Sequence, residues 1–428
     1  MRPRTVLSLF TGAGGMDLGL EAAGFEPALC VEVDEDSRAT LKKNRPEWRL
    51  ANPGDIHALE PDEILRQAGI KPRELRLLAG GPPCQPFSKS AYWSNGNGSR
   101  LQDPRARTLR AYLRVVEAAL PEVLLLENVK GLAYKNKDEG IKLLRRELAA
   151  INQRHGTRYE LQDIHLNAAA YGVPQMRERL FLVATVDGRS LELPPATHGE
   201  APGLERYRTA WDAIGHLDEE TWPSELDPRG RWAALLPSIP EGENYLWHTP
   251  RNEQKGGEPL FGWRTRYWSF LLKLAKNKPS WTIQAEPGPA TGPFHWRSRL
   301  LSIEELCRLQ TFPQGYEIIG TRSSAHRQVG NAVPSAIGEL LGLEIRRQLF
   351  GDSVRRTLRL IPAARSDCPL PVRPSPVPKE YLDLRGRHRD HPGPGLGPGA
   401  QRRERELGEA RRQRCLAPSA EQARMDVH

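Results

Sequence analysis

The stretch Thr5-Val-Leu-Ser-Leu-Phe-Thr-Gly-Ala-Gly-Gly-Met-Asp17 joins a short apolar run to a glycine-rich turn near the start of a 428-residue chain. The apolar residues over 5–10 predict a buried strand. The glycines let the backbone approach a ligand closely, and the helix expected after them presents free N–H groups to an anionic ligand. The stretch therefore predicts a strand–turn–helix unit with a ligand at its turn. For this motif alone, an ordinary tight turn is the open alternative.

Strand-like runs recur along residues 1–190 and alternate with stretches of helical periodicity. The further runs cover 28–33, 75–79, 123–126 and 179–186, and the helical stretches include 37–44, 106–119 and 140–152. Such alternation predicts an α/β fold with a doubly wound parallel sheet covered by helices on both faces. Ligands of sheets of this kind bind at the carboxyl ends of the strands.

The middle of the chain has a different character. Residues 199–298 are irregular, rich in Gly and Pro, and hold eight of the ten tryptophans. This composition predicts a separate loop-rich module whose tryptophans form its core. Helical periodicity returns at 302–310 and 334–350. We therefore expect one α/β domain in two parts, 1–198 and 299–351, with the module inserted between them.

The tail, residues 352–428, is rich in Arg, Pro and Gly and has too little apolar surface to order itself. It holds 16 Lys and Arg against 10 Asp and Glu, so much of the chain's net charge of +9 lies there. Overall charge therefore does not establish nucleic-acid binding. We expect the tail to be disordered and its deletion to preserve function.

The cysteines and the apolar runs bear on compartment and metal content. The five cysteines are scattered and form no C-x-x-C pair, which predicts reduced thiols and neither a zinc site nor a disulfide framework. No apolar run approaches the ~20 residues needed to cross a bilayer, and no secretory signal is recognisable. We therefore expect a cytoplasmic protein that needs no metal and no membrane.

Cys84 lies in Gly80-Gly-Pro-Pro-Cys-Gln-Pro-Phe-Ser88, directly after a predicted strand. Prolines on both sides hold the backbone rigid, and the paired glycines allow a sharp turn. A cysteine presented in this way suits a nucleophile, which must be exposed and partly thiolate. A lone cysteine is more often a packing residue, but packing needs no such frame, so we favour the nucleophile.

Charged residues stand beside other predicted strands. Glu32 ends the second strand, twenty positions after Gly12, where an acidic residue accepts hydrogen bonds from ribose hydroxyls. Glu127 closes a strand and is a candidate acid. Arg177 and Arg179 alternate, so in extended chain both point to one face and suit anionic or base-edge contacts. Each alone has a plain solvent-exposed alternative, but together they indicate one site at the carboxyl ends of the strands.

The chain resembles the bacterial type of DNA (cytosine-5)-methyltransferase. The matching segments keep the family's order: 10–25, Glu32, 54–56, 80–88, 127–129, 175–179, 299–313 and 328–334. Pro-Pro-Cys-Gln-Pro-Phe-Ser and Gln-Val-Gly-Asn-Ala-Val-Pro are specific even individually. The resemblance implies the Rossmann-like fold of S-adenosylmethionine-dependent methyltransferases, with 199–298 as a small target-recognition domain.

The activity implied by this resemblance is methyl transfer from S-adenosylmethionine to C5 of a cytosine flipped out of double-stranded DNA, through a covalent bond between Cys84 and C6. Glu127 would protonate N3, and Arg179 and Arg177 would bind the cytosine. The implied cofactor residues are Phe10, Thr11, Gly12, Gly14, Gly15, Glu32, Asp55, Ile56, Pro83, Asn331 and Val333. The implied DNA contacts are Gln85, Ser88, Arg100, Thr282 and Ile283. Val33 departs from the family, which often carries an aromatic or polar residue there.

We further expect a monomer. A restriction–modification system, in which an endonuclease acts on the same target sequence, and a solitary enzyme both stay open. Three alternatives stay open. A tRNA-methylating relative would normally carry a Cys-Phe-Thr element, which this chain lacks. A catalytically silent DNA-binding relative should have lost Cys84, Glu127 or the glycines of the first turn. A cysteine hydrolase would need a histidine near the cysteine motif.

Overall fold

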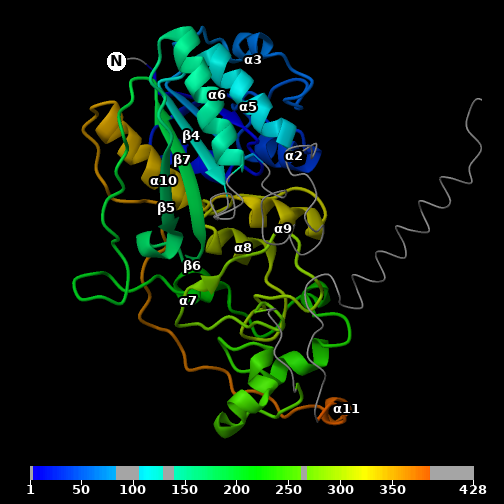
Figure 1. The fold of residues 1–428 in the computed structure, drawn as a ribbon. Coiled ribbons are helices and arrows are strands. Elements are labelled where there is room, and N and C mark those ends of the chain that lie inside the picture. The colour runs from blue at the N-terminus through cyan, green and yellow to red at the C-terminus, as the bar shows by residue number, and fades with distance from the viewer. Residues whose placement is uncertain (1–2, 83–105, 129–138, 262–267, 386–428) are drawn as a thin grey trace, which may run out of the picture.

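The computed structural model describes residues 3–82, 106–128, 139–261 and 268–385. In these residues a six-stranded sheet of order β2-β1-β3-β4-β7-β5 forms the upper part of the molecule (Figure 1). Its strands are β1 (Thr5–Leu9), β2 (Glu26–Val31), β3 (Leu77–Gly80), β4 (Val123–Asn128), β5 (Gln162–Asn167) and β7 (Glu178–Thr185). Every strand predicted from the sequence is present, with bounds shifted by no more than two residues.

The sheet is mixed, which corrects the prediction of a parallel sheet. Strands β1 to β4 are parallel, but β7 runs antiparallel to both β4 and β5. The connection from β5 to β7 covers only 168–177, and a parallel crossover needs a dozen residues or more. The chain therefore turns back as a hairpin, and β7 enters the sheet with reversed direction.

Strand β5 was not predicted. Its core-facing residues Ile164 and Leu166 are buried, whereas the intervening Asp163 and His165 are exposed. This alternation is typical of a half-buried edge strand. Two apolar residues among polar neighbours leave too weak a hydrophobic signal for a run-based prediction.

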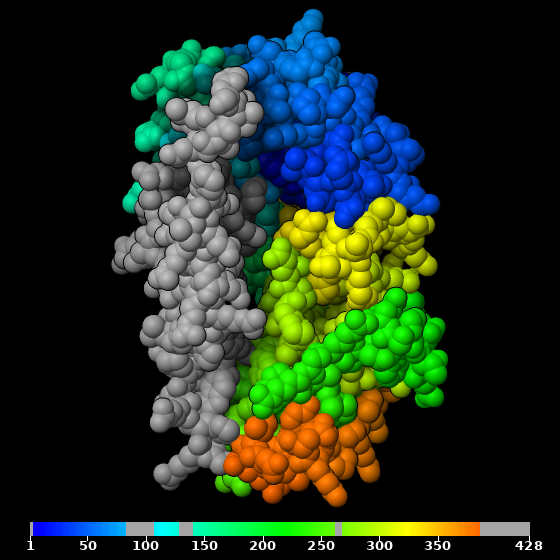
Figure 2. Space-filling model, turned by 90° about the vertical axis from the view of Figure 1, so that its right-hand side faces the viewer, coloured from blue at the N-terminus to red at the C-terminus, as the bar shows by residue number. Residues whose placement is uncertain are grey.

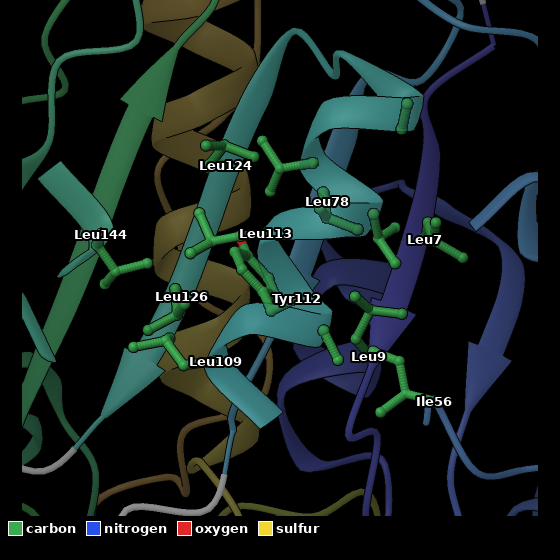
Figure 3. Close-up of a cluster of buried hydrophobic side chains, with 14 of the residues drawn as sticks. Leu7, Leu9, Ile56, Leu78, Leu109, Tyr112, Leu113, Leu124, Leu126 and Leu144 are labelled. Carbon is green, nitrogen blue, oxygen red and sulfur yellow. The ribbon is translucent and has the colours of Figure 1, made fainter. Parts of the chain in front are cut away.

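Helices cover both faces of the sheet, as predicted. One face carries α3 (Pro61–Ala68), α5 (Ala106–Ala119) and α6 (Glu139–His155), and the other carries α1 (Gly15–Ala22) and α10 (Ser335–Glu344). Figure 3 shows Leu7, Leu78, Leu124 and Leu126 of the strands facing Tyr112 and Leu113 of α5. Alternate residues of each strand thus fill two cores, one on each side.

Helices α1 and α10 pack unusually closely, through a pair of glycines. A Cβ added at Gly19 would collide with the backbone of α10, at Ser335 O and Glu339 N. A Cβ added at Gly338 would collide in turn with Met16 O. The segment after the module therefore completes the first domain by direct backbone contact.

The remaining helices of this returning segment are α8 (Ile303–Leu309) and α9 (Arg322–Asn331). Helix α8 begins with a capping box, in which Ser302 and Glu305 satisfy each other's backbone N–H groups. Helix α10 continues as a π-helical turn, Ile345–Leu349. The helices predicted at 302–310 and 334–350 are thus confirmed.

The inserted module has short elements only. They include α7 (Ala210–Ile214), several 3₁₀ turns, and β8 (Ser280–Trp281), which pairs with β6 (Gln175–Met176) of the first domain. One part of the module, with Trp211 and Trp296, packs against the returning segment. The distal part has its own hydrophobic core, which includes Leu235, Tyr245 and Phe294.

The tail follows an ordered path over 352–385, which corrects the prediction for this part of it. It leaves the first domain, runs down beside the module and ends at α11 (Lys379–Leu382) at the base of the molecule (Figures 1 and 2). Arg359 pairs with Glu339, Val372 N donates to Glu241, and Tyr381 is buried in the distal core. Strap residues such as Leu360 and Val377 also pack against the two cores, so the order comes from polar contacts together with scattered apolar anchors, which composition does not show. Residues 386–428 lie outside the described residues.

We refer to residues 352–385 as the strap. No helix in the described part of the chain is long and apolar enough to cross a membrane.

Candidate functional site

A cavity of about 520 Å³ opens at the edge of the sheet where β1, β2, β3 and β4 end. This volume is typical of small-molecule sites. Figure 2 shows a recess between the N-terminal segments, in blue, and the returning segment, in yellow. Of the residues predicted to bind a cofactor, those lining the cavity are Phe10, Thr11, Gly12, Gly15, Glu32, Asp55, Ile56, Asn331 and Val333.

The turn after β1 shapes the cavity floor. Phe10, Gly12 and Gly14 all have positive φ, at 59°, 56° and 79°, so the chain reverses tightly before α1. A Cβ added at Gly12 would meet nothing within 4 Å, which shows that this glycine borders open space. A Cβ at Gly14 would instead meet Leu41 at 3.0 Å. Gly14 therefore serves the turn and does not line the cavity, unlike its predicted role.

Glu32 is held by the backbone at the end of β2. Its two carboxylate oxygens accept hydrogen bonds from Gly12 N at 2.6 Å and from Asp34 N at 2.8 Å. Burial raises the pKa of Glu32, and these two hydrogen bonds oppose that effect. A carboxylate has about four acceptor positions, so two directions stay available to a ligand's hydroxyl groups.

The far wall of the cavity is the turn 54–57. A Cβ at Gly54 would collide with Glu32 O, so the turn is pressed against the end of β2. Asp55 accepts a hydrogen bond from His57 N at 2.9 Å, which fixes its carboxylate at the cavity edge. Val33, between these walls, is 63% exposed although it is a large apolar residue. An apolar surface offered to a cavity suits a flat ring.

One corner of the cavity holds an ion pair. Glu127 at the end of β4 lies 2.8 Å from Arg179 at the start of β7, and their side chains are only 12% and 13% exposed. Both residues line the cavity. Arg179 reaches this edge because β7 is antiparallel, so its amino end lies beside the carboxyl end of β4. Arg179 was predicted to lie at the carboxyl end of a strand, and it lies instead at the amino end of β7.

Arg177 does not share this corner, although alternation predicted that both arginines point one way. It is fully buried, and its guanidinium donates to Ile283 O at 3.2 Å, Gly330 O at 2.8 Å and Ala332 O at 2.9 Å. The chain between β6 and β7 is not regular strand, so alternation fails there. Arg177 ties the first domain, the module and α9 together.

The returning segment closes the cavity through polar contacts that sequence reasoning missed. Arg327 of α9 donates to Asp34 at 3.0 Å, across the cavity mouth from β2. Gln328 accepts from Thr40 at 2.8 Å and donates to Ile319 O at 2.7 Å. Buried amides of this kind carry no hydrophobic pattern, so only the motif Gln328-Val-Gly-Asn-Ala-Val-Pro334 could have pointed to them.

Asp17, also missed, lies beneath the glycine turn and lines the cavity. Burial raises its pKa to about 6, and a hydrogen bond with Ser8 opposes that shift. Its Oδ1 atom is buried without a hydrogen-bond partner among the described residues. An unpaired buried acceptor beside a cavity complements a cationic or N–H-bearing ligand.

Thr282 and Ile283, predicted as DNA contacts, differ in exposure. Ile283 is 1% exposed and packs in the core between module and returning segment. Its side chain therefore cannot reach DNA in this structure, which corrects that prediction. Thr282 is exposed and donates to Met176 O at 2.7 Å, beside the β6–β8 pair.

Five predicted site residues lie outside the described residues: Pro83, Cys84, Gln85, Ser88 and Arg100. Gly81 and Pro82, which immediately precede them, line the cavity. The described cysteines are poor rival nucleophiles, because burial raises the pKa of Cys307 to about 12 and that of Cys30 well above its usual value. The exposed Cys368 lies on the strap and does not line the cavity.

The chain is similar to known proteins in family profile, in sequence and in solved structure. The profile described as C-5 cytosine-specific DNA methylase matches residues 4–347. The Type II methyltransferase M.SacI of Streptomyces achromogenes is 35% identical over 374 residues, covering 80% of this chain and 93% of that protein. The Type II methyltransferase M.AquIA of Picosynechococcus is 37% identical over 235 residues, covering 52% of this chain and 92% of that protein.

Two solved structures share the fold. A putative DNA modification methyltransferase encoded in an Escherichia coli prophage superposes with a TM-score of 0.55 at 21% identity, covering 81% of this chain and 99% of that chain. The Entamoeba histolytica methyltransferase EhMeth superposes with a TM-score of 0.54 at 15% identity, covering 82% and 99%. The strap lies beyond the residues that the family profile matches.

Proposed function

This chain belongs to the C-5 cytosine-specific DNA methylase family, and from that premise we propose that it transfers a methyl group from S-adenosylmethionine to C5 of a cytosine in double-stranded DNA. The observation that carries the proposal is the cavity itself, since the Glu127–Arg179 pair and the glycine turn after β1 line the same space. Donor and base would therefore meet at one edge of the sheet.

The cavity residues fit the proposed methyl donor. Open space in front of Gly12 admits a ligand against the turn, and Glu32 retains acceptor capacity for ribose hydroxyls. The unpaired Asp17 oxygen and the N–H groups at the start of α1 complement an ammonium and a carboxylate. Asp55 and the exposed Val33 would contact the adenine. The bound donor supplies an electrophilic methyl group on a sulfonium, and the chain supplies everything else.

The chain's own residues would activate the cytosine. The ring is a poor nucleophile at C5, so we propose that the Cys84 thiolate adds to C6 and makes C5 electron-rich. Glu127 would hydrogen-bond and protonate N3, which prevents charge from building on the ring. Arg179 would bind the cytosine beside Glu127. After C5 gains the methyl group, loss of the C5 proton expels the Cys84 thiolate and restores the ring.

This chemistry requires an extruded base. A cytosine stacked in a duplex exposes neither C6 nor N3 to a buried cavity, so the base must be flipped at a cost of a few kcal/mol. Gln85, Ser88 and Arg100, which follow the nucleophile in sequence, stay proposed DNA contacts. We likewise propose that the enzyme is a monomer and that a restriction endonuclease acts on the same target sequence.

The direct test is incubation with labelled S-adenosylmethionine and mixed duplex DNA, followed by bisulfite sequencing. We expect protected cytosines within one short motif, which would identify the recognition sequence as well as the reaction. Transfer to tRNA in place of DNA would overturn the assignment of substrate. Binding of DNA without any transfer would show a catalytically silent relative.

A further inference from the structure

In the described part of the chain, three of the five large apolar residues that are exposed line a cavity or a hollow. Among the described residues, the large apolar side chains that are exposed are Val33, Trp268, Trp281, Leu370 and Val372. Val33 lines the cavity at the edge of the sheet, and Leu370 and Val372 lie on the strap. The two tryptophans, 64% and 51% exposed, both line a second hollow of about 610 Å³ in the module.

These exposures correct part of the expectation that the module's tryptophans form its core. Trp211 and Trp296 are buried as expected, at 7% and 0%. Trp268 and Trp281 are not, and two exposed tryptophans gathered at one hollow are typical of an interaction site.

Both exposed tryptophans stand on anchored backbone. Trp281 ends β8, where it pairs with Met176, and its carbonyl accepts a hydrogen bond from Ser280 Oγ at 2.8 Å. The buried Asn244 donates to Trp268 O at 2.9 Å. A rigid aromatic side chain on fixed backbone loses little entropy when it is covered, which is typical of residues that dominate binding.

The same hollow carries unpaired positive charge. Arg251 and Lys255 line it, are exposed, and form no ion pair with any residue that the structure describes. Glu243 is the carboxylate among its lining residues and is only partly exposed. Aromatic faces beside two free cations match a nucleic acid, with its apolar bases and anionic backbone.

The hollow adjoins the cavity at the edge of the sheet that was described above. Gln284 lines the hollow and Gly330 lines the cavity. A Cβ added at Gly330 would meet Ala285 Cα at 2.5 Å and Gln284 O at 2.7 Å, so the two walls are in direct contact. The hollow and the cavity therefore lie next to each other, with residues 284–285 and Gly330 between them.

We propose that Trp268 and Trp281 are specificity-determining DNA contacts, which pack against base edges of the recognition sequence while Arg251 and Lys255 bind phosphates. The inference rests on the proposed function but goes beyond it, since it assigns sequence reading to one hollow within a module of about a hundred residues. Trp281 directly precedes Thr282, so the predicted DNA contact at Thr282 lies on the rim of the same hollow.

The test compares Trp281→Ala and Trp268→Ala with Leu370→Ala in the full chain. Leu370 is 89% exposed but lies on the strap, so it controls for loss of exposed apolar surface. Once bisulfite sequencing of wild-type product gives the target, the dissociation constant is measured by fluorescence anisotropy on a duplex carrying it. We expect each tryptophan variant to weaken binding roughly 5- to 150-fold, with the control and S-adenosylhomocysteine binding unchanged.

Specificity is measured on duplexes with single base-pair changes. A tryptophan variant should narrow the affinity gap between target and altered duplexes at particular positions. Arg251→Gln and Lys255→Gln should weaken all duplexes alike and lower the salt slope by about one each. If the wild type is active and both tryptophan variants keep its affinity and selectivity, this inference is wrong, whereas the proposed function still stands. A wild type that neither binds nor methylates any duplex would overturn the proposed function instead.

Discussion

Two acidic side chains at the cavity, Glu127 and Asp17, differ in whether a positively charged residue lies beside them. Glu127 faces Arg179 at 2.8 Å, so its carboxylate has a charged neighbour. Asp17 has no such neighbour, and burial raises its pKa to about 6. The first residue belongs to the chemistry that we propose, and the second is a costly buried acid that a ligand could complement.

Cys84→Ser should lower methyl transfer by three orders of magnitude or more, on the order of what loss of a nucleophile costs in other enzymes. A serine hydroxyl is far less acidic than a thiol and cannot add to C6 at neutral pH. Duplex binding by anisotropy should be retained, because the substitution removes one atom's chemistry and little volume. Loss of the unfolding transition in this variant would show a structural cysteine instead.

Asp17→Asn should change how stability depends on pH. The carboxyl has a folded pKa of about 6 against 3.8 unfolded, so its stabilising contribution is fully present below the unfolded value and is lost as pH rises through about 6. The asparagine variant lacks this loss. Urea unfolding of both apo proteins from pH 4 to 7 should show the variant gaining about 2 kcal/mol on the wild type. Parallel pH profiles would contradict the buried acid.

Arginines two positions apart serve different elements, one joining three segments and the other facing the cavity. Arg177 satisfies carbonyls of the β8 region and of α9, whereas Arg179 pairs with the end of β4. Their spacing in the sequence predicted that both side chains point to one face. Because the strand is interrupted between β6 and β7, the two side chains point to different parts of the molecule.

Arg177→Met should destabilise the fold by about 3 kcal/mol or more, because it leaves buried carbonyls without donors. Arg179→Met is its matched control and should lose methyl transfer with a much smaller loss of stability. Thermal unfolding and single-turnover methylation of both variants distinguish the two roles. Equal loss of stability in both would mean that Arg179 is also mainly structural.

At the scale of the whole molecule, a strap beyond the residues that the family profile matches adds contacts to both of its parts. Asp352 pairs with Arg4 and Arg346 at the first domain, and Tyr381 stacks on Trp232 in the distal core of the module. Between them, Leu370 O accepts from the buried Lys276. One segment thus contacts both parts of the molecule.

Truncation after residue 351 should therefore lower the melting temperature by about 5–10 °C, because the distal core loses Tyr381 and its neighbours. Truncation after residue 385 keeps the strap and should leave stability and methylation unchanged. Differential scanning calorimetry of the two truncations, with methylation assays, tests this. A stable and fully active protein ending at 351 would restore the expectation of a dispensable tail.

Binding of the whole enzyme to its duplex should weaken steeply with salt, because phosphate contacts release condensed counterions. A plot of log Kd against log salt concentration for the target duplex should have a slope of several units. A flat response would count against duplex DNA as the substrate.

Local patterns were sufficient for much of this architecture. Every strand of the main sheet except β5, most helices and the glycine turn follow from short-range periodicity and from residues such as Gly12 and Glu32, whose roles depend on neighbours in sequence. The family resemblance rested on motifs of the same short range. These features are predictable because each is set by backbone preferences and burial within one segment.

Tertiary structure alone decided the direction of β7, the burial of Arg177 and Ile283, the order of the strap and the exposure of Trp268 and Trp281. Each of these depends on contacts between segments far apart in the chain, such as Arg177 with Gly330. Composition and periodicity describe a residue's neighbours in sequence, whereas burial is determined by its neighbours in space. For this protein the boundary runs between the α/β frame, which local patterns specify, and the contacts that join module, strap and cavity.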